Sequence, residues 1–276
     1  MNIRGTFSAM KPSLIIIFLA ILSSGFEQQE ITAMPIKHII SDDHIKIAYD
    51  HYQAGHSKVL IIAPGFYNNK DTYLFKKIAQ SFFTQYDIIL FDFRGHGKST
   101  GAFEWTASEA NDLASVIKYA KEQRYEKIGV MGFSLGAAIS LIEASHNQDI
   151  DTLIIVSAPF DFWKINYHFW KPEMIADLKL NLGPKGRGKS IRPGHPFNKK
   201  IKPIDIVDQI SPIPVLFIHG QKDWLISYRH SIRLYKKAIR PKELVIIPDA
   251  GHAEKIYDSN PEIFEDICLR WLEKTL

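Results

Sequence analysis

Ser134 stands at the centre of the pentapeptide Gly132-Phe-Ser-Leu-Gly136, which follows an apolar run and precedes small and apolar residues typical of a helix. A strand, a sharp turn and a helix in this order force the central residue into a strained backbone conformation. Glycines on both sides leave room for the neighbouring chain. The pattern predicts that the hydroxyl of Ser134 is exposed at the turn as a nucleophile.

Two further segments supply the partners that such a serine needs. A serine hydroxyl is a weak nucleophile at neutral pH unless a histidine accepts its proton and a carboxylate orients that histidine. The apolar run 215–218 leads to Asp223, and the apolar run 244–247 leads to His252. The order Ser, Asp, His along the chain is that of the α/β-hydrolases rather than of other serine-protease folds. We therefore predict Ser134, Asp223 and His252 as a catalytic triad.

Two other carboxylates compete with Asp223 for the orienting role. Asp161 follows the preceding strand, where some hydrolases carry the acid, and Asp249 lies in the loop that bears the histidine. We expect Asp161 to cap a helix and Asp249 to be a turn residue, because short polar side chains favour both positions. His96 and His219 also lie near strand ends, and we assign them structural positions without a role in the reaction.

The composition excludes several classes of site. The chain has 276 residues, a formal net charge of +4 and a single cysteine, so it contains no internal disulfide framework and no multi-cysteine metal centre. Cys268 lies on the apolar face of a predicted C-terminal helix and is expected in the core. Since a triad needs neither a metal nor an organic cofactor, we expect none.

The spacing of apolar residues predicts the fold after position 34. Short apolar runs alternate with longer amphipathic segments, which is the pattern of a mostly parallel sheet with helices on both faces. The predicted strands are residues 59–63, 88–91, 128–131, 153–156, 215–218 and 244–247. The predicted helices are residues 73–83, 108–123, 134–144, 228–238 and 261–274. Residues 36–40 and 45–52 are predicted as an antiparallel hairpin at the sheet edge. We expect one α/β domain at residues 35–276.

The stretch from about residue 160 to residue 210 interrupts this alternation. We predict a short cap insertion here, over the carboxyl ends of the strands where ligands bind in open α/β sheets. Its aromatic side chains form either the core of the cap or a wall for an acyl chain. The basic residues of the cap loop are Lys185, Arg187, Lys189, Arg192, Lys199, Lys200 and Lys202. They are either a solvated surface or a contact for anionic lipid head groups or an anionic substrate group.

Residues 183–190 match the letters of a P-loop. A P-loop joins a buried strand to a helix whose first amides hold phosphate, and neither element is predicted here. No recognised nucleic-acid-binding module accompanies the basic charge. We therefore expect neither nucleotide nor nucleic-acid binding.

Residues 1–25 have the pattern of a secretory signal peptide. Arg4 and Lys11 precede an apolar run at residues 14–22, and small residues follow it before a cleavage point near Gly25. The prediction is export to the periplasm or the medium. An uncleaved membrane anchor and translation from Met34, which would leave the protein in the cytoplasm, are the alternatives.

Residues 91–99, Phe-Asp-Phe-Arg-Gly-His-Gly-Lys-Ser, follow a predicted strand one crossover before the pentapeptide. With the pentapeptide and the triad order, this segment resembles the α/β-hydrolase superfamily, specifically its serine aminopeptidase and monoacylglycerol-lipase-like branch, from about residue 58 onward outside the cap. In that family the residue after a His-Gly pair donates its backbone N–H to an oxyanion. Here Pro64 replaces the histidine, and the resemblance implies Phe66 as one donor and Leu135 as the other.

The resemblance implies a serine hydrolase that cleaves carboxylic esters, including lipid-like acyl esters, through an acyl-enzyme intermediate. Its partner would be a small-molecule acyl substrate. The alternatives left open are an aminopeptidase or amidase of the same fold, acyl transfer to an alcohol, and a non-catalytic relative that binds a ligand.

Overall fold

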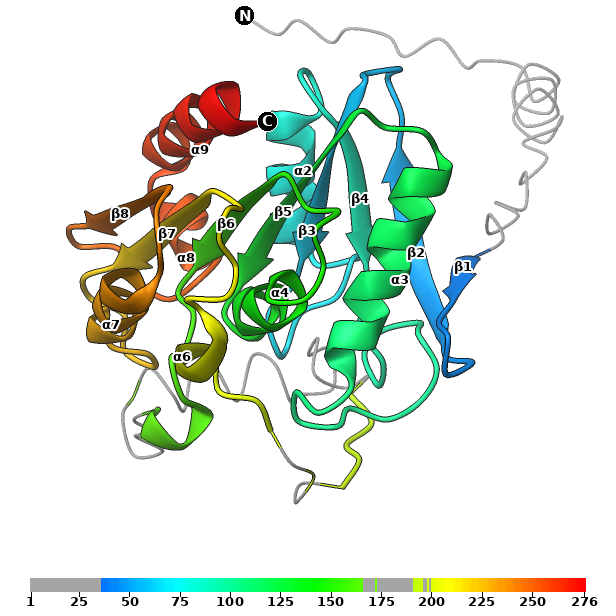
Figure 1. The fold of residues 1–276 in the computed structure, drawn as a ribbon, viewed down its shortest axis with the longest axis horizontal. Coiled ribbons are helices and arrows are strands. Elements are labelled where there is room, and N and C mark those ends of the chain that lie inside the picture. The colour runs from blue at the N-terminus through cyan, green and yellow to red at the C-terminus, as the bar shows by residue number, and fades with distance from the viewer. Residues whose placement is uncertain (1–35, 166–171, 173–190, 196–197, 199) are drawn as a thin grey trace, which may run out of the picture. The chain divides into compact units, whose positions relative to one another are not determined.

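Strand pairing joins residues that are far apart in the sequence into one eight-stranded sheet (Figure 1). A computed structural model describes residues 36–165, 172, 191–195, 198 and 200–276. The strands are β1 (Lys37–Ile40), β2 (Lys46–Tyr52), β3 (Lys58–Ala63), β4 (Asp87–Phe91), β5 (Lys127–Phe133), β6 (Thr152–Val156), β7 (Val215–Gly220) and β8 (Lys242–Ile247). Their order is β1-β2-β4-β3-β5-β6-β7-β8. The β1–β2 and β2–β4 pairs are antiparallel, and the other pairs are parallel.

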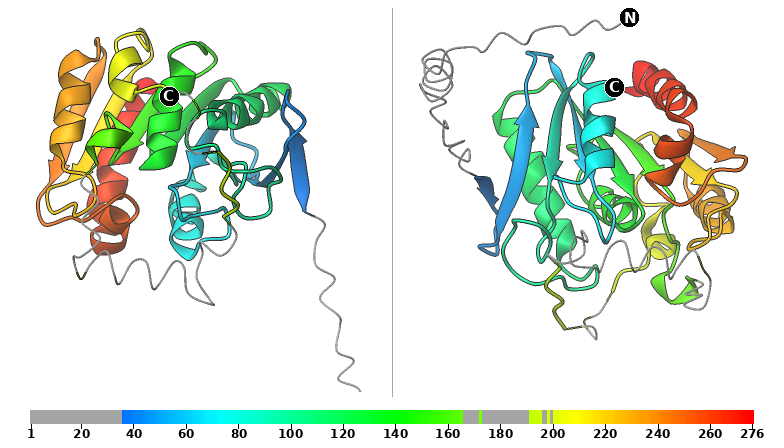
Figure 2. Two further views of the ribbon diagram at one scale, coloured as in Figure 1. Left: turned by 90° about the horizontal axis from the view of Figure 1, so that it is seen from below. Right: turned by 180° about the vertical axis from the view of Figure 1, so that it is seen from behind.

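Helices cover both faces of this sheet, as the two further views in Figure 2 show. The α-helices in the described part of the chain are α2 (Tyr73–Phe82), α3 (Glu109–Glu122), α4 (Leu135–Ala144), α6 (Pro203–Ile206), α7 (Arg229–Lys237), α8 (Lys255–Ser259) and α9 (Pro261–Thr275). One core cluster contains side chains of α3, α4 and α7, and the other contains side chains of α2, α8 and α9. The predicted fold class, including the edge hairpin, is confirmed.

The continuous apolar runs follow from this layering, since each central strand is buried on both faces. In β3, Val59 and Ile61 pack in the cluster under α3 and α4, whereas Leu60 and Ile62 pack in the cluster under α2 and α9. Successive side chains of a strand point to opposite faces, so a strand between two helical layers needs an apolar residue at every position. Cys268 of α9 is fully buried in the second cluster, as predicted.

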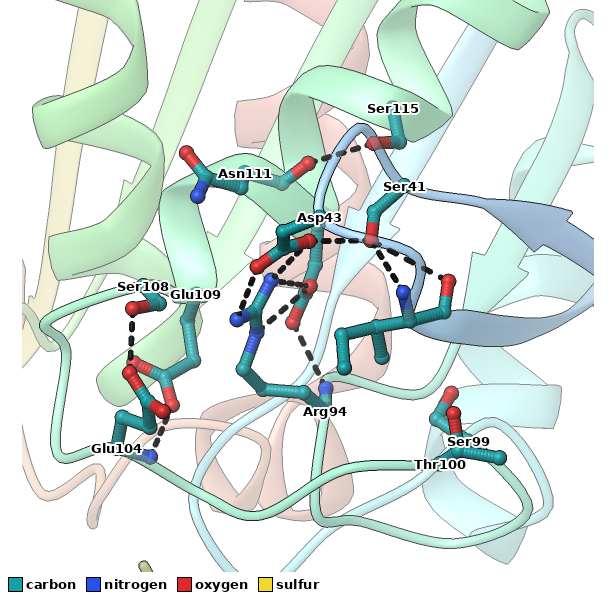
Figure 3. A network of polar contacts seen from close by, with 12 residues as sticks. Ser41, Asp43, Arg94, Ser99, Thr100, Glu104, Ser108, Glu109, Asn111 and Ser115 are labelled. Atoms are coloured by element: carbon teal, nitrogen blue, oxygen red, sulfur yellow. Dashed lines mark hydrogen bonds and ion pairs between the residues drawn. The ribbon is translucent and has the colours of Figure 1, made fainter. Parts of the chain in front are cut away.

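A polar network fixes the loop after β4 against α3 and the β1–β2 turn (Figure 3). The guanidinium of Arg94 donates to both carboxylates of Asp112 and Asp43, with its shortest bond to each at 2.7 Å. The backbone N–H of Arg94 also donates to Asp112. Burial raises the pKa of Asp112 to about 6, although the bonds from Arg94 oppose that shift. Arg94 of the segment 91–99 therefore anchors the loop that contains it.

The cap is described only in part. Its two ends meet where the N–H of Ile204 donates to the carbonyl of Phe160 (3.0 Å) and where Lys202 pairs with Asp161 (3.1 Å). Between them, residues 162–164 form a short 3₁₀ helix. The P-loop-like sequence and the basic residues Lys185, Arg187, Lys189 and Lys199 lie outside the described residues, as does the predicted signal peptide. Within the described residues, no helix is both long enough and apolar enough to span a membrane.

Candidate active site

Ser134 occupies a strained turn between β5 and α4. Its φ and ψ angles are 51° and −108°, a left-handed conformation that few non-glycine residues adopt. The turn is held because the N–H of Ser134 donates to the carbonyl of Val156 on the neighbouring strand β6 (2.8 Å). The flanking glycines are needed for close packing: a Cβ at Gly132 would lie 2.7 Å from the Cα of Ala137, and one at Gly136 would lie 2.3 Å from the carbonyl oxygen of Ala63.

The side chains of Ser134, His252 and Asp223 lie in a hydrogen-bonded row. Nε2 of His252 is 2.9 Å from Oγ of Ser134, and Nδ1 of His252 is 2.7 Å from Oδ2 of Asp223. An ionised carboxylate can only accept, so Nδ1 carries the proton and Nε2 can accept the proton of the serine hydroxyl. The loops after β5, β7 and β8 bring these residues together, although Ser134 is 118 residues and Asp223 is 29 residues before His252 in the sequence. The row has the geometry of a nucleophile, its general base and an orienting acid.

Asp223 is held as a buried carboxylate. Its side chain is fully buried, and Oδ1 accepts the backbone N–H groups of Leu225 (3.0 Å) and Ile226 (2.8 Å). Oδ2 lies within reach of two imidazoles, His252 and His219. Burial alone would raise the pKa of Asp223, but the charge of His252 and the hydrogen bonds from both histidines outweigh it and hold the pKa well below its usual range. Asp223 is therefore an anion at neutral pH.

The two backbone amides predicted for the oxyanion belong to the loop after β3 and to the start of α4. Leu135 is the first residue of α4, where a backbone N–H has no partner within the helix and the helix dipole favours negative charge. Phe66 follows Gly65, whose ideal Cβ would lie 3.5 Å from Cβ of Ser134. The loop after β3 therefore runs directly beside the nucleophile, despite the proline at position 64.

Aromatic side chains surround this part of the site. The ring of Phe66 lies 4.6 Å from that of Tyr67, 5.0 Å from that of Phe103 and 6.0 Å from that of Trp105, centroid to centroid. The ring of Trp224 lies 6.5 Å from that of His252. The sequence predicts aromatic surface from the cap and does not indicate the buried Phe103 or the half-buried Trp105. Both lie in an irregular loop before α3 that no hydrophobic period marks.

Cap aromatics at residues 160–163 have different surroundings. Phe160 packs on the imidazole of His230 with ring centroids 4.4 Å apart. The guanidinium of Arg233 lies over the ring of Phe160, 4.8 Å from its centroid. Trp163 is 75% exposed and has Lys200 over its ring. Phe160 is therefore part of the packed base of the cap, whereas Trp163 is not. The aromatic residues at 167, 169 and 170 lie outside the described residues.

The two competing carboxylates lie in the predicted capping and turn positions. Asp161 accepts the N–H of Trp163 at 2.9 Å and caps the short 3₁₀ helix. Asp249 has a φ of 61° in the loop after β8, and its exposed side chain pairs with Lys222. His219 is different, because it contacts the carboxylate of Asp223 itself. The signal for this contact in the sequence was its spacing, four residues before Asp223 at the end of the same predicted strand.

His96 has no such contact with the row. Its Nδ1 is 3.0 Å from the carbonyl of Arg94, and burial lowers its pKa. In the described part of the chain, no group of three or more His, Cys, Asp or Glu side chains is arranged to hold a metal ion. The chemistry available to the described residues is that of the Ser134, His252 and Asp223 row.

Comparison with known proteins assigns the fold and relates the chain to several proteins. A protein family described as alpha/beta hydrolase fold matches residues 58–189. The uncharacterized protein YfhR of Escherichia coli O157:H7 is 25% identical over 199 residues, which are 69% of this chain and 62% of that protein. The chain thus spans about three fifths of the length of the curated relatives it matches.

Solved structures share this fold over most of their length. The esterase Pf2001 of Pyrococcus furiosus superimposes with a TM-score of 0.72 at 23% identity, covering 87% of this chain and 91% of that one. The esterase EaEST of Exiguobacterium antarcticum does so with a TM-score of 0.68 at 18% identity, covering 87% of this chain and all of that one. At these identities the likeness establishes the fold.

Proposed function

Since this chain is a member of the α/β-hydrolase superfamily, we propose that it is a serine hydrolase that cleaves carboxylic esters through an acyl-enzyme intermediate. The observation that carries the proposal is the position of one imidazole, His252, within hydrogen-bond distance of both Ser134 Oγ and Asp223 Oδ2. Such a row converts a weak hydroxyl nucleophile into a reactive one.

The reaction proceeds in two halves. Oγ of Ser134 attacks the ester carbonyl while Nε2 of His252 takes the hydroxyl proton, and the backbone N–H groups of Phe66 and Leu135 bind the developing oxyanion. The imidazolium then protonates the departing alkoxide, which leaves an acyl group on Ser134. In the second half His252 removes a proton from water, the hydroxide attacks the acyl carbonyl, and the acid leaves as Ser134 regains its proton. Each oxyanion donor contributes about 3 kcal/mol to the stabilisation of the transition state.

Two features favour an ester over a peptide as substrate. The half-buried rings of Phe66 and Trp105, which pack on the buried ring of Phe103, form apolar surface at the proposed oxyanion donor, which suits an acyl chain. An aminopeptidase also needs a carboxylate that pairs with the free ammonium of its substrate. Glu254, two residues after His252, is already bonded to the side-chain amide of Asn68. The likeness in fold to two esterases agrees with this preference without deciding it.

The first experiment tests whether the chain is an enzyme at all. A fluorophosphonate probe should label the wild-type protein and not Ser134→Ala, since labelling requires an activated serine. Ser115→Ala is the control, because the hydroxyl of Ser115 bonds to the carbonyl of Asn111 on α3 and not to the loops of the proposed triad. A folded wild type that resists the probe would favour the non-catalytic ligand-binding alternative.

The second experiment tests the substrate class. p-Nitrophenyl esters of increasing chain length are compared with aminoacyl p-nitroanilides under the same conditions. We expect turnover on the esters, with a preference among chain lengths set by the apolar surface at Phe66 and Trp105. Turnover of the anilides alone would replace the ester proposal with the amidase alternative. Added alcohol would show whether acyl transfer competes with hydrolysis, through the ratio of new ester to free acid.

Export through the segment 1–25 and contact of the basic cap loop with anionic membranes stay predictions. The intact mass of the mature protein tests the first, because cleavage near Gly25 removes a defined mass. Sedimentation with vesicles containing anionic lipid, compared with neutral vesicles, tests the second.

A further inference from the structure

A second histidine contacts the carboxylate of the proposed triad. His219 is at the end of β7, four residues before Asp223, and the side chains of both residues are fully buried. Nε2 of His219 lies 3.0 Å from Oδ2 of Asp223 and 2.8 Å from the carbonyl oxygen of Ile226. Nδ1 of His219 lies 2.7 Å from the hydroxyl of Ser231 on α7. Every polar atom of this imidazole therefore has a defined neighbour.

These neighbours determine which nitrogen carries the proton. The carbonyl of Ile226 and the ionised carboxylate of Asp223 can only accept, so Nε2 must be the donor and shares its N–H between them. In neutral His219, Nδ1 then accepts the hydroxyl proton of Ser231. The ring is thereby fixed with its N–H between the carbonyl oxygen of Ile226 and the Asp223 oxygen that also faces His252.

We propose that His219 is a positioning residue for the triad, whose Nε2–H holds the same oxygen of Asp223 that accepts the Nδ1–H of His252. This inference rests on the proposed function. Backbone N–H groups already fix Oδ1 of Asp223, and His219 fixes Oδ2, so the carboxylate cannot rotate away from His252. The N–H of His219 also stabilises part of the negative charge on Oδ2, so that less of this charge acts on His252.

The second effect distinguishes positioning from simple core packing. A carboxylate that loses one hydrogen-bond donor attracts the remaining one more strongly, so the imidazolium form of His252 becomes more favourable. The base would then need a higher pH to be neutral and accept the proton of Ser134. A histidine that only fills space would leave this pH unchanged when replaced. The other titratable groups nearby are His230 and Arg233 on α7, Glu254 in the histidine loop, and the exposed pair Lys222 and Asp249.

Three variants test the proposal through the rate of fluorophosphonate labelling measured against pH. His219→Leu removes the donor, and His219→Gln returns an N–H close to the position of Nε2. His51→Leu is the matched control: His51 is a half-buried histidine of β2 that bonds to the hydroxyls of Tyr119 (3.1 Å) and Tyr125 (2.7 Å), so its loss also removes two side-chain hydrogen bonds. Circular dichroism and thermal melts identify the variants that are folded.

We expect His219→Leu to lower the plateau rate about tenfold or more and to move the midpoint of the pH profile upward by about half a unit or more. His219→Gln should recover most of both effects, and His51→Leu should keep the wild-type midpoint. An unchanged or lower midpoint in folded His219→Leu would overturn the proposal. If His219→Leu fails to fold, the test uses His219→Gln alone. A folded His219→Gln that labels more slowly than the wild type and has a midpoint different from that of the wild type would overturn the proposal too. Failure of the wild type to label would instead overturn the proposed function.

Discussion

The side-chain amide of Asn68 donates to the carboxylate of Glu254 across 3.1 Å. Asn68 is buried in the loop after β3, and its backbone N–H closes a turn onto the carbonyl of Gly65 (3.0 Å), directly around Phe66. Glu254 is two residues after His252. The pair therefore links the loop of a proposed oxyanion donor to the loop of the proposed base.

Replacement of Asn68 by leucine should loosen this link. We expect kcat for a p-nitrophenyl ester to fall about tenfold with little change in KM, because the Phe66 amide acts on the transition state more than on the bound ester. Steady-state kinetics separates the two parameters. Glu254→Gln is the control, since its side-chain oxygen still accepts the bond and most of kcat should remain. A rise in KM alone would mean that Asn68 shapes substrate binding instead.

Gly136→Ala should damage the site through the backbone. The added Cβ would lie 2.3 Å from the carbonyl oxygen of Ala63 and 2.5 Å from that of Pro64, so the loop after β3 and the start of α4 must separate. We expect kcat to fall about 100-fold, and the free energy of unfolding to fall by about 1–3 kcal/mol. Gly251→Ala is the control, because its Cβ would meet only the Cβ of Lys255 at an ordinary 3.5 Å. Equal losses in both variants would argue against a special role for this close approach.

The sequence predicted most of the fold because burial on both faces leaves a strong apolar signal. The apolar signal is weaker at the ends of strands and helices. β8 begins at Lys242, two residues before the predicted start, because Lys242 and Glu243 pair with β7 at the edge of the sheet while their polar side chains give no strand signal. β5 extends to Phe133 because its pairing with Val156 continues up to the serine turn.

The residues of the proposed triad could be predicted because their types and their order along the chain are typical of one kind of chemistry. Residue types and order were enough to propose Ser134, Asp223 and His252 as a triad, and the structure brings their side chains into one hydrogen-bonded row. The spacing of four residues between His219 and Asp223 was visible in the sequence, but it did not show that the two side chains meet, since that contact depends on how the loop after β7 folds back on the strand. Residue types and order could not reveal the aromatic neighbours of Phe66 either, because Trp105 has a φ of 58° in an irregular loop.

Asp223→Asn tests which carboxylate orients the base. The amide can present its N–H₂ to His252 and favour the wrong tautomer, so we expect kcat/KM to fall about 10⁴-fold. Asp161→Asn is the matched control for the competing position. Its side-chain oxygen can still accept the N–H of Trp163, so kcat/KM should stay within a few-fold of the wild type. A large loss in Asp161→Asn with a small loss in Asp223→Asn would transfer the orienting role to Asp161.

We expect the buried carboxyl group of Glu109 to make the stability of the protein depend on pH. It is fully buried at the start of α3 and accepts the N–H of Glu104 through Oε1 (Figure 3), while Oε2 has no partner among the described residues. Burial raises the pKa of Glu109 to about 7, from a usual value of 4.5. Between these values the folded state binds more protons than the unfolded state, so this contribution to stability is present below about pH 4.5 and is lost as the pH rises through 7.

Glu109→Gln removes this dependence, because the amide still accepts the N–H of Glu104 but cannot ionise. We expect the wild type to lose roughly 2 kcal/mol of unfolding free energy relative to the variant between pH 5 and pH 8. Urea denaturation of both proteins at the two pH values measures this double difference. The raised pKa of Asp92, about 6, acts in both proteins and cancels. The charge of Asp112 raises the pKa of Glu109, so the double difference measures the two coupled carboxylates together. A difference in stability that is the same at both pH values would show that Glu109 stays ionised in the fold, with its charge balanced by Arg94 across the network of Figure 3.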